Sequence, residues 1–216
     1  VAATIDAGST PLVLGGDHSV AIGSLAGSGR DDPIGVVWFD AHGDFNTPTM
    51  SPSGNVHGMP LAAALGRGEF DAMPWARSPG LAEDNVALVG IRDLDGDERD
   101  AIADSDVTAF TMSDLDERGI AAVVDDALAA AGDGVDGLHV SLDLDFLDPV
   151  TAPGVGTPVR GGATYREAHA AMEAVAESGL LRSLELVEVN PILDQHNETA
   201  ELAAELAGSA FGKRIL

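Results

Sequence analysis

The stretch Ile34–Asn46 reads IGVVWFDAHGDFN and joins an apolar run to a cluster of ionisable residues. The run IGVVWF shows no alternation of polar and apolar residues, which is typical of a strand whose two faces are both covered. Asp40, His42 and Asp44 follow at once, where the strand should end. Strands buried on both faces belong to parallel sheets with helices on either side. The stretch therefore predicts an α/β protein.

Short apolar runs and Ala-rich helical patterns alternate along the rest of the chain. In Tyr165–Glu177, for example, Ala168, Ala171, Met172 and Val175 recur at helical spacing and predict one buried stripe. We expect a single domain over residues 1–216, built as a three-layer αβα sandwich with a mostly parallel sheet. The expected strands are Pro11–Leu14, Ile34–Phe39, Val86–Ile91, Val107–Phe110, Gly137–Leu144 and Leu184–Val189. The expected helices are His18–Ala26, His57–Leu65, Glu98–Asp104, Ile120–Ala131, Tyr165–Glu177 and Thr199–Phe211, with a Gly- and Pro-containing loop at Gly66–Asp84.

The composition excludes several classes of partner. The chain has 36 acidic and 11 basic residues, and its formal charge of −25 repels nucleic acids and anionic membranes. It has no cysteine, so disulfides, thiolate metal sites and a cysteine nucleophile are excluded. Such an excess of acids with a single lysine suits solubility in concentrated salt, and we hypothesise a halophilic source.

The chain shows no sign of a membrane segment or a secretion signal. Its apolar runs are shorter than the ~18 residues that a membrane span needs. Its first residues, VAATIDAGSTPLVLGG, carry no basic segment like that of a signal peptide. We therefore expect a cytoplasmic protein with no membrane partner.

Ionisable residues follow four of the expected strands. In open α/β sheets, ligands bind beyond the carboxyl ends of the strands, so polar residues that follow strands are candidates for a site. Alone, the motif of Asp40, His42 and Asp44 is equally explained as a loop that caps the next helix, and LDLD is more often a strand end with turn-forming aspartates. His18 could lie at an ordinary helix start with Asp17 or Ser19 as its cap, but all of these motifs fall at the same edge. The residues are Asp17 and His18; Asp40, His42 and Asp44; Asp143 and Asp145; and Glu188.

The spacing of these acids predicts bound cations. On an extended backbone, side chains two residues apart point the same way, so we expect Asp40, His42 and Asp44 to converge, and likewise Asp143 and Asp145. At ~4 Å and an effective dielectric constant of ~20, each pair of like charges repels by roughly 4 kcal/mol. Carboxylates and imidazoles without thiolates favour an ion such as Mn²⁺ over a structural Zn²⁺. Two ions bridged by carboxylates would use all the ligands and would lower the pKa of a bridging water.

Two further residues suggest the substrate. His57, in SGNVHGMP, could carry a proton to a leaving amine because imidazole titrates near pH ~6.5; a packing role at a helix start is the alternative. Glu188 closes an apolar strand, where a guanidinium group would satisfy its carboxylate with charge-assisted hydrogen bonds. An acidic pocket of this kind favours a cationic substrate over an anionic one.

The motifs GGDHS, DAHGD, SGNVHGMP, SLDLDFLDP, GVGTPV and LVEVNP together resemble the ureohydrolases, and specifically the arginase family, in the family's order. The resemblance implies a three-layer α/β fold and a centre of two Mn²⁺ ions per chain, whose bridging hydroxide hydrolyses a guanidino group to urea. It implies three catalytic residues: His57 as the proton shuttle, Asp44, and Glu188 as the acid that binds the guanidinium group. The implied metal ligands are His18, Asp40, His42, Asp44, Asp143 and Asp145.

The resemblance also implies residues that hold the rest of the substrate. Asn46 and Ser53 match positions that contact an α-carboxylate, and Asn55 and Asp95 match positions near an α-amino group. Thr157 lies in the GTPV loop and is a further implied contact, with Glu188 at the guanidinium end. Agmatine lacks the carboxylate, so this set favours L-arginine, with L-ornithine and urea as products and a place in arginine metabolism and the urea cycle.

Two alternatives stay open. The first is agmatinase or another hydrolase of guanidino compounds, because the metal motifs are shared. The second is a catalytically inactive metal-binding fragment: the family begins with a further strand and helix, whereas only about ten residues precede the first expected strand here. We therefore expect a sheet that lacks an interior strand and exposes an unpaired edge. The resemblance further implies a homo-oligomer, a trimer or a hexamer.

Overall fold

The computed structural model describes residues 1–214, and its centre is a six-stranded sheet in the order β1-β6-β5-β2-β3-β4. Every neighbouring pair of strands is parallel. All the strands expected from the sequence are present, with bounds that differ by a few residues. They are β1 (Leu12–Leu14), β2 (Ile34–Phe39), β3 (Leu81–Ile91), β4 (Thr108–Thr111), β5 (Leu138–Asp143) and β6 (Leu181–Val187).

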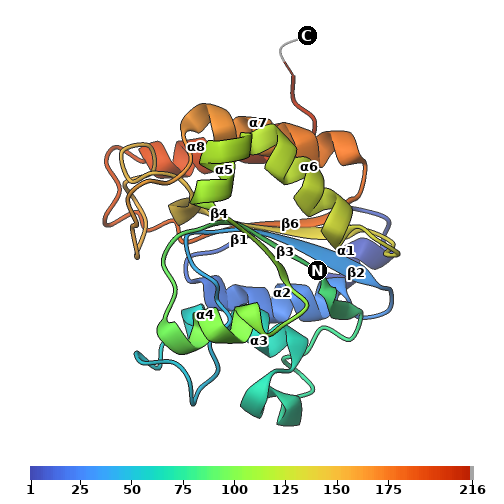
Figure 1. Cartoon of the computed structure of the whole chain (residues 1–216). Helices are drawn as coiled ribbons and strands as arrows, with labels where there is room; N and C mark the ends of the chain where they lie inside the picture. The colour runs from blue at the N-terminus through green and yellow to red at the C-terminus, as the bar shows by residue number, and fades with distance from the viewer. Residues whose placement is uncertain (215–216) are drawn as a thin grey trace.

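Helices cover both faces of the sheet, which confirms the three-layer sandwich. Helices α5, α6, α7 and α8 lie on one side of the sheet, and α2, α3 and α4 lie on the other (Figure 1). The helices are α1 (Ala2–Asp6), α2 (Ala21–Ser28), α3 (Pro60–Leu65), α4 (Gly96–Ala103), α5 (Met112–Arg118), α6 (Ile120–Ala131), α7 (Tyr165–Ser178) and α8 (Glu198–Ala210). Short 3₁₀ turns lie at His18–Val20, Val56–Gly58, Gly68–Ala72 and Leu144–Phe146.

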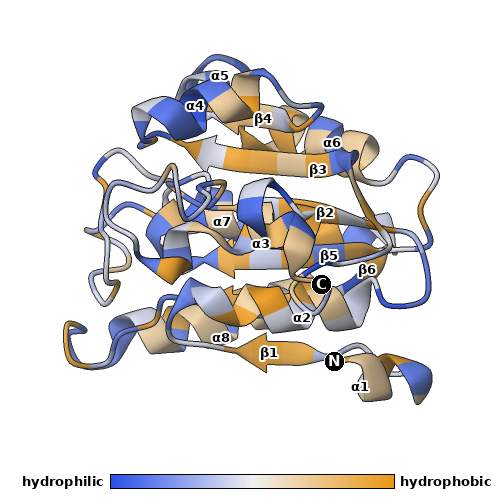
Figure 2. Ribbon diagram, turned by 90° about the horizontal axis from the view of Figure 1, so that it is seen from below, coloured by the Kyte–Doolittle hydropathy of each residue, from blue (hydrophilic) through white to orange (hydrophobic). Residues whose placement is uncertain are grey.

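The strand β2 shows why the sequence needs two covering layers. Val37 and Phe39 belong to the apolar cluster that includes residues of α6, α7 and α8. Val36 and Trp38 belong to a second cluster, which includes residues of α2 and α3. Successive side chains of a strand point to opposite faces, so an unbroken apolar run serves both cores. The strands are accordingly mostly hydrophobic, while several helices combine a hydrophobic and a hydrophilic side (Figure 2).

Helix α7 forms as its periodicity predicts. Thr164 precedes it, and its side chain accepts a hydrogen bond from the backbone of Glu167, whose carboxylate in turn accepts one from the backbone of Thr164. This capping box satisfies two backbone donors at the start of the helix. The residues of the helix that are buried are Ala168, Ala171, Met172 and Val175, the stripe expected from the sequence.

Three features differ from the sequence-based expectation. Helices α1 and α5 were not predicted, because each is short and lacks a clear apolar period. The segment Gly66–Asp84, expected to be a loop, contains the 3₁₀ turn Gly68–Ala72 and the first residues of β3. The sheet has no internal gap; the expected unpaired edge is β1, where Leu12 and Leu14 are exposed.

None of the helices among residues 1–214 is long and apolar enough to cross a membrane.

Candidate active site

The four strands that carry the ionisable motifs are neighbours in the sheet. Their order is β1-β6-β5-β2, and all of them run in the same direction. The residues that follow them therefore meet at one edge, as the rule for parallel sheets predicts. The structure brings together the expected metal ligands His18, Asp40, His42, Asp44, Asp143 and Asp145.

These residues form two groups that share Asp40. In the first group, His18 Nδ1 lies 2.9 Å from Asp44 Oδ2, 3.1 Å from Asp143 Oδ2 and 3.3 Å from Asp40 Oδ2. In the second, His42 Nδ1 lies 3.1 Å from Asp145 Oδ2 and 3.3 Å from Asp40 Oδ1. Asp40 thus directs one oxygen toward each histidine, which is the arrangement of a carboxylate that bridges two cations.

Turns, and not the extended backbone expected from the sequence, make these side chains converge. Asp44 has a left-handed backbone with φ 49°. Asp145 lies in a 3₁₀ turn, and its backbone N–H donates to Asp143 Oδ1 at 2.7 Å. In the same way the His42 N–H donates to Asp40 Oδ1 at 2.7 Å. The acids at the start of each turn therefore fix the backbone of the ligand two residues later.

Gly43 allows the first of these turns to pack closely. A Cβ atom at this position would lie 2.8 Å from Ile102 Cδ1 and 2.9 Å from Leu94 Cδ2. Both distances are shorter than real Cβ contacts, so a larger residue at this position would force these two side chains to move. Gly43 therefore allows the segment between His42 and Asp44 to pack closely against these side chains.

A second set of contacts orients His18. Its Nε2 lies 2.8 Å from Ser141 Oγ, and its ring stacks on Trp38 with centroids 4.3 Å apart and planes 8° apart. Trp38 Nε1 donates in turn to Asp40 Oδ2 at 2.9 Å. A hydrogen bond on one ring nitrogen directs the other nitrogen toward the ligand position. His18 Nδ1 is accordingly the nitrogen that faces the acids.

Burial and mutual repulsion dominate the electrostatics of the cluster. Burial, reinforced by the charge of Asp40, raises the pKa of Asp44 to about 7. Burial together with neighbouring aspartates raises the pKa of Asp143 and that of Asp145. Burial would lower the pKa of His42, but its contacts with Asp145 and Asp40 outweigh burial and raise that pKa to about 12. Four acids thus share two imidazoles, and the protein offers too little positive charge for them.

The donor set fits a pair of divalent cations. Among residues 1–214, His18 Nδ1 and Asp44 Oδ2 are buried and make no hydrogen bond, although they lie 2.9 Å apart. The ligand atoms of His18, Asp40 and Asp44 all lie within 4.8 Å of one another, and so do those of Asp40, His42 and Asp145. Carboxylate oxygens with one imidazole per ion suit Mn²⁺ and similar ions.

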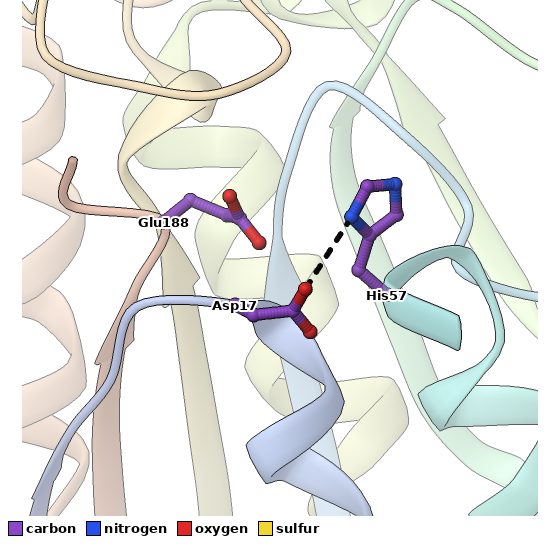
Figure 3. A group of neighbouring side chains, drawn as sticks. All are labelled: Asp17, His57 and Glu188. Atoms are coloured by element: carbon purple, nitrogen blue, oxygen red, sulfur yellow. Dashed lines mark ion pairs between the residues drawn. The ribbon is translucent and has the colours of Figure 1, made fainter. Parts of the chain in front are cut away.

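Asp17, His57 and Glu188 form a further group of neighbouring side chains (Figure 3). Asp17 Oδ2 lies 3.7 Å from His57 Nδ1. Glu188 Oε1 accepts a hydrogen bond from the backbone N–H of His18 at 2.7 Å, and the Glu188 N–H donates to Gly16 O at 2.6 Å. Partial burial raises the pKa of Glu188. The loop after β1 therefore carries the metal ligand His18 and also hydrogen-bonds to Glu188, the predicted guanidinium-binding acid, which follows β6.

A pocket opens over the metal-ligand cluster and contains most of the predicted site residues. Asp40 and Asp145 are not on its surface because they are buried behind it. Asn55, predicted near an α-amino group, does not line the pocket; it is exposed and precedes the 3₁₀ turn at Val56–Gly58. The predicted residues that line it are His18, His42, Asp44, Asn46, Ser53, His57, Asp95, Asp143, Thr157 and Glu188.

Hydrogen bonds tie the predicted substrate-binding residues to the pocket wall. Asn46 Nδ2 donates to Asp95 Oδ2 at 3.1 Å. Thr157 Oγ1 donates to Asp145 Oδ2 at 3.1 Å, so the GTPV loop rests directly on a metal-ligand residue. Ser53 Oγ accepts from the backbone N–H of Asn55 at 3.2 Å.

Four residues of the pocket were not expected from the sequence. Glu98 accepts hydrogen bonds from the backbone N–H of Phe45 at 2.9 Å and that of Asp95 at 3.2 Å, and so joins α4 to the segment that follows β2. The signal was present, because the polar run RDLDGDE follows β3 at the same edge of the sheet. The four residues are Ser51, Gly58, Asp93 and Glu98.

Comparisons with known proteins agree with this geometry. A family profile described as "Arginase family" matches residues 1–212. The arginase of Bacillus caldovelox is 50% identical over 214 residues, which are 98% of this chain and 72% of that protein. The native structure of that arginase superimposes with a TM-score of 0.94 at 49% identity, over 99% of this chain and 72% of the other.

A more distant structure gives the same picture. The Entamoeba histolytica arginase in complex with L-ornithine superimposes with a TM-score of 0.86 at 34% identity, over 94% of this chain and 70% of the other. The shared fold, the family profile and the identity over nearly the whole chain lead to one assignment. This chain belongs to the arginase family.

Proposed function

We propose that the chain hydrolyses L-arginine to L-ornithine and urea at a centre of two Mn²⁺ ions. The observation that carries the proposal is the pair of ligand groups joined by Asp40, placed in one pocket with Glu188. The names and identities of the relatives support the same reaction.

The six predicted ligands divide between the two ions as the geometry suggests. Asp40 would contact both, as the shared carboxylate. When bound, the two Mn²⁺ ions supply the positive charge that lowers the pKa of a water molecule and polarises the group under attack. The ions would be held by His18, Asp44 and Asp143 on one side, and by His42 and Asp145 on the other.

Glu188 would bind and orient the guanidinium group. Its carboxylate can form charge-assisted hydrogen bonds with two N–H groups of a planar guanidinium. The hydrogen bond from the His18 N–H holds one of its oxygens in place and leaves the other open. The guanidinium carbon would then face the metal-ligand cluster, because His18 is itself a ligand.

Two groups could move the proton that the leaving amine needs. Asp44 lies in the inner wall of the pocket, and His57 lies at its mouth beside Asp17. An imidazole at the mouth can exchange protons with solvent and deliver one to the amine nitrogen as the C–N bond breaks. We assign this step to His57, with Asp44 as the carboxylate that accepts a proton from the attacking water.

The outer wall of the pocket suits the α-amino and α-carboxylate groups of an amino acid. Asp95, with the neighbouring Asp93, can accept hydrogen bonds from an ammonium group, and Asn46 and Ser53 can donate to a carboxylate. Thr157 adds a hydroxyl group on the opposite loop. The L-ornithine bound to the Entamoeba histolytica relative carries both groups. Agmatine carries no carboxylate, so these donors favour arginine.

A urea assay with a panel of guanidines tests the proposal. With added Mn²⁺ in concentrated salt, we expect more urea from L-arginine than from agmatine or other guanidines, and almost no urea from the Asp143→Ala variant. A preference for agmatine would replace the substrate assignment. Two bound Mn²⁺ per chain with no urea from any guanidine would support the inactive metal-binding alternative.

We also propose a cytoplasmic, salt-adapted homo-oligomer, either a trimer or a hexamer, that acts in arginine metabolism and the urea cycle. The net charge of −25 supports the salt adaptation, because screening by salt reduces repulsion between surface acids. We expect a stable oligomer in concentrated salt that unfolds on dialysis to low salt. Light scattering across a salt series measures both the oligomeric state and its dependence on salt. Indifference of the fold to salt would overturn the halophilic part.

A further inference from the structure

Arg92 lies directly after β3, behind the metal-ligand cluster, with its guanidinium group half-buried. It makes no ion pair among residues 1–214, although acids surround it. Instead its Nη1 and Nη2 atoms donate to five backbone carbonyls. These are Gly90 at 3.2 Å, Asp145 at 2.5 Å, Phe146 at 3.3 Å, Leu147 at 3.4 Å and Val159 at 2.8 Å.

These carbonyls belong to the segments that carry one half of the metal centre. Three of them belong to Asp145, a metal-ligand residue, and to the two residues that follow it, in and directly after the 3₁₀ turn Leu144–Phe146. Val159 lies in the loop of Thr157, whose hydroxyl donates to Asp145 Oδ2. One guanidinium group therefore joins the end of β3 to both loops that position Asp145.

The backbone of Arg92 adds a link to the second metal-ligand loop. Its N–H donates to the carbonyl of Ala41 at 2.9 Å, between the ligands Asp40 and His42. The Ala41 N–H donates in turn to Asp145 Oδ1 at 3.1 Å. All the ligands of the group formed by Asp40, His42 and Asp145 are thus connected through Arg92.

Gly162, which has no side chain, leaves room for this guanidinium group. A Cβ atom at Gly162 would lie 2.6 Å from Arg92 Nη2 and 2.5 Å from the carbonyl carbon of Leu147. Any larger residue at this position would displace the guanidinium group or the turn. A lysine could not replace Arg92, because its ammonium group has three donors around a single point and not a planar fork.

We propose that Arg92 is a positioning residue that fixes the half of the metal centre formed by Asp40, His42 and Asp145, and so sets the affinity for the second Mn²⁺ ion. The inference rests on the dimanganese part of the proposed function. The effect of Arg92 on metal affinity can be separated from its charge. Because the positive charge of Arg92 repels a cation, any gain in Mn²⁺ affinity must come from the geometry that Arg92 imposes on the ligands. Loss of such outer contacts typically weakens metal affinity by ~10–100-fold.

Two variants separate geometry from charge. Arg92→Lys keeps the charge and loses the fork, whereas Arg92→Met keeps the apolar stem and loses the charge. In a calorimetric titration with Mn²⁺, we expect both to bind the first ion as the parent chain does and the second ion ~10–100-fold more weakly. At saturating Mn²⁺, kcat should recover, and KM for arginine should change little. The matched control is Arg99→Lys, because Arg99 is exposed and, within residues 1–214, its side chain pairs only with Asp100.

The outcomes that overturn the inference are equally specific. Parent-like affinity for both ions in Arg92→Lys would show that the fork is not needed, and tighter binding in Arg92→Met would show that the charge dominates. If circular dichroism shows that Arg92→Met does not fold, Gly162→Ala replaces it, since it disturbs the contact between the guanidinium group and the turn without changing any charge. Parent-like Mn²⁺ binding by Gly162→Ala would count against the inference. A parent chain that binds two Mn²⁺ but releases no urea contradicts the proposed reaction and leaves this titration meaningful.

Discussion

Glu185 and Asp143 lie on the neighbouring strands β6 and β5, and both carboxyl groups are buried. Glu185 has its own partners: His139 Nε2 lies 3.4 Å from its Oε1, and the Ser24 hydroxyl donates to its Oε2. Burial alone would raise the pKa of Glu185, but the neighbouring His139 outweighs burial, so the net effect is a lowered pKa. Asp143 shares His18 with two other aspartates, and burial with the repulsion of its neighbours raises its pKa well above the ordinary value.

The difference lies in where the compensating charge comes from. Glu185 faces an imidazole and a hydroxyl group of the protein, those of His139 and Ser24. The cluster around Asp143 has four aspartates and two histidines, so it needs cations from outside. The first pair should therefore support the fold with or without metal, and the second should support it only when metal is bound. The following variants and treatments test this contrast.

The largest effect is expected from Asp143→Ala. Loss of one ligand from the cation-dependent cluster removes several kcal/mol of charge stabilisation, which corresponds to a decrease of about 10³-fold in urea release with added Mn²⁺. The measurement is a urea assay together with the number of Mn²⁺ ions bound. Asp100→Ala on α4 is the control, because Asp100 is exposed and its carboxylate pairs, in the part of the chain that the structure describes, only with Arg99. Retained urea release in Asp143→Ala would refute the ligand assignment.

The next effect is expected from Glu185→Ala. Removing one partner of a buried pair leaves the other unpaired and costs about 3–5 kcal/mol of unfolding free energy. Chemical denaturation monitored by circular dichroism measures this loss, which should be the same with and without Mn²⁺. A loss that disappears when Mn²⁺ is added would break the contrast between the two clusters.

The lowered pKa of Glu185 adds a pH dependence with a definite sign. A carboxyl group with a depressed pKa in the folded state stabilises the fold above its ordinary pKa, near ~4.3, and this stabilisation is lost as the pH falls through the folded value. The difference in unfolding free energy between the parent chain and Glu185→Gln should therefore shrink on acidification. A difference that grows at low pH would contradict the assignment of His139 as the compensating group.

Removal of divalent ions should lower the melting temperature of the parent chain. A ligand at about 100 times its Kd stabilises a protein by ~2.7 kcal/mol, which corresponds to roughly 5–10 °C for a domain of this size. Differential scanning calorimetry with and without a chelator measures the change. Glu185→Gln should show the same decrease as the parent chain and Asp143→Ala a smaller one, because Asp143→Ala keeps only the group of Asp40, His42 and Asp145 intact. Equal melting temperatures with and without metal in the parent chain would refute the need for outside charge.

The smallest effect is expected in the outer wall of the pocket. Ser53→Ala removes one donor to the α-carboxylate, and we expect KM for arginine to rise about tenfold, while KM for agmatine stays unchanged. Asn55→Ala is the matched control, because Asn55 follows closely in the same loop and does not line the pocket. Parallel kinetics with both substrates measure the effect. An equal rise for agmatine would mean that Ser53 shapes the pocket and does not recognise the carboxylate.

The sequence was sufficient for features that depend on neighbouring residues. Helix α6 has the bounds Ile120–Ala131 that its periodicity predicts, and the buried run at Ile34–Phe39 is β2. The six ligand candidates were also recognisable, because each motif follows a strand and the carboxyl ends of parallel strands share an edge. By contrast, α5 was missed because seven mostly polar residues give no clear period.

Only the tertiary structure could assign the contacts made across the sheet. The strand order places β5 beside β2, and this brings Asp145 to Ala41 across 104 positions of the chain. The same packing directs the two oxygens of Asp40 to different histidines, and it excludes Asn55 from the pocket that Ser53 lines. Arg92 is the clearest case, because nothing in its own motif indicates which carbonyls it binds. The spacing of apolar residues within a segment predicts which of its side chains are buried. The partners of a polar atom depend instead on which distant segments the fold brings beside it.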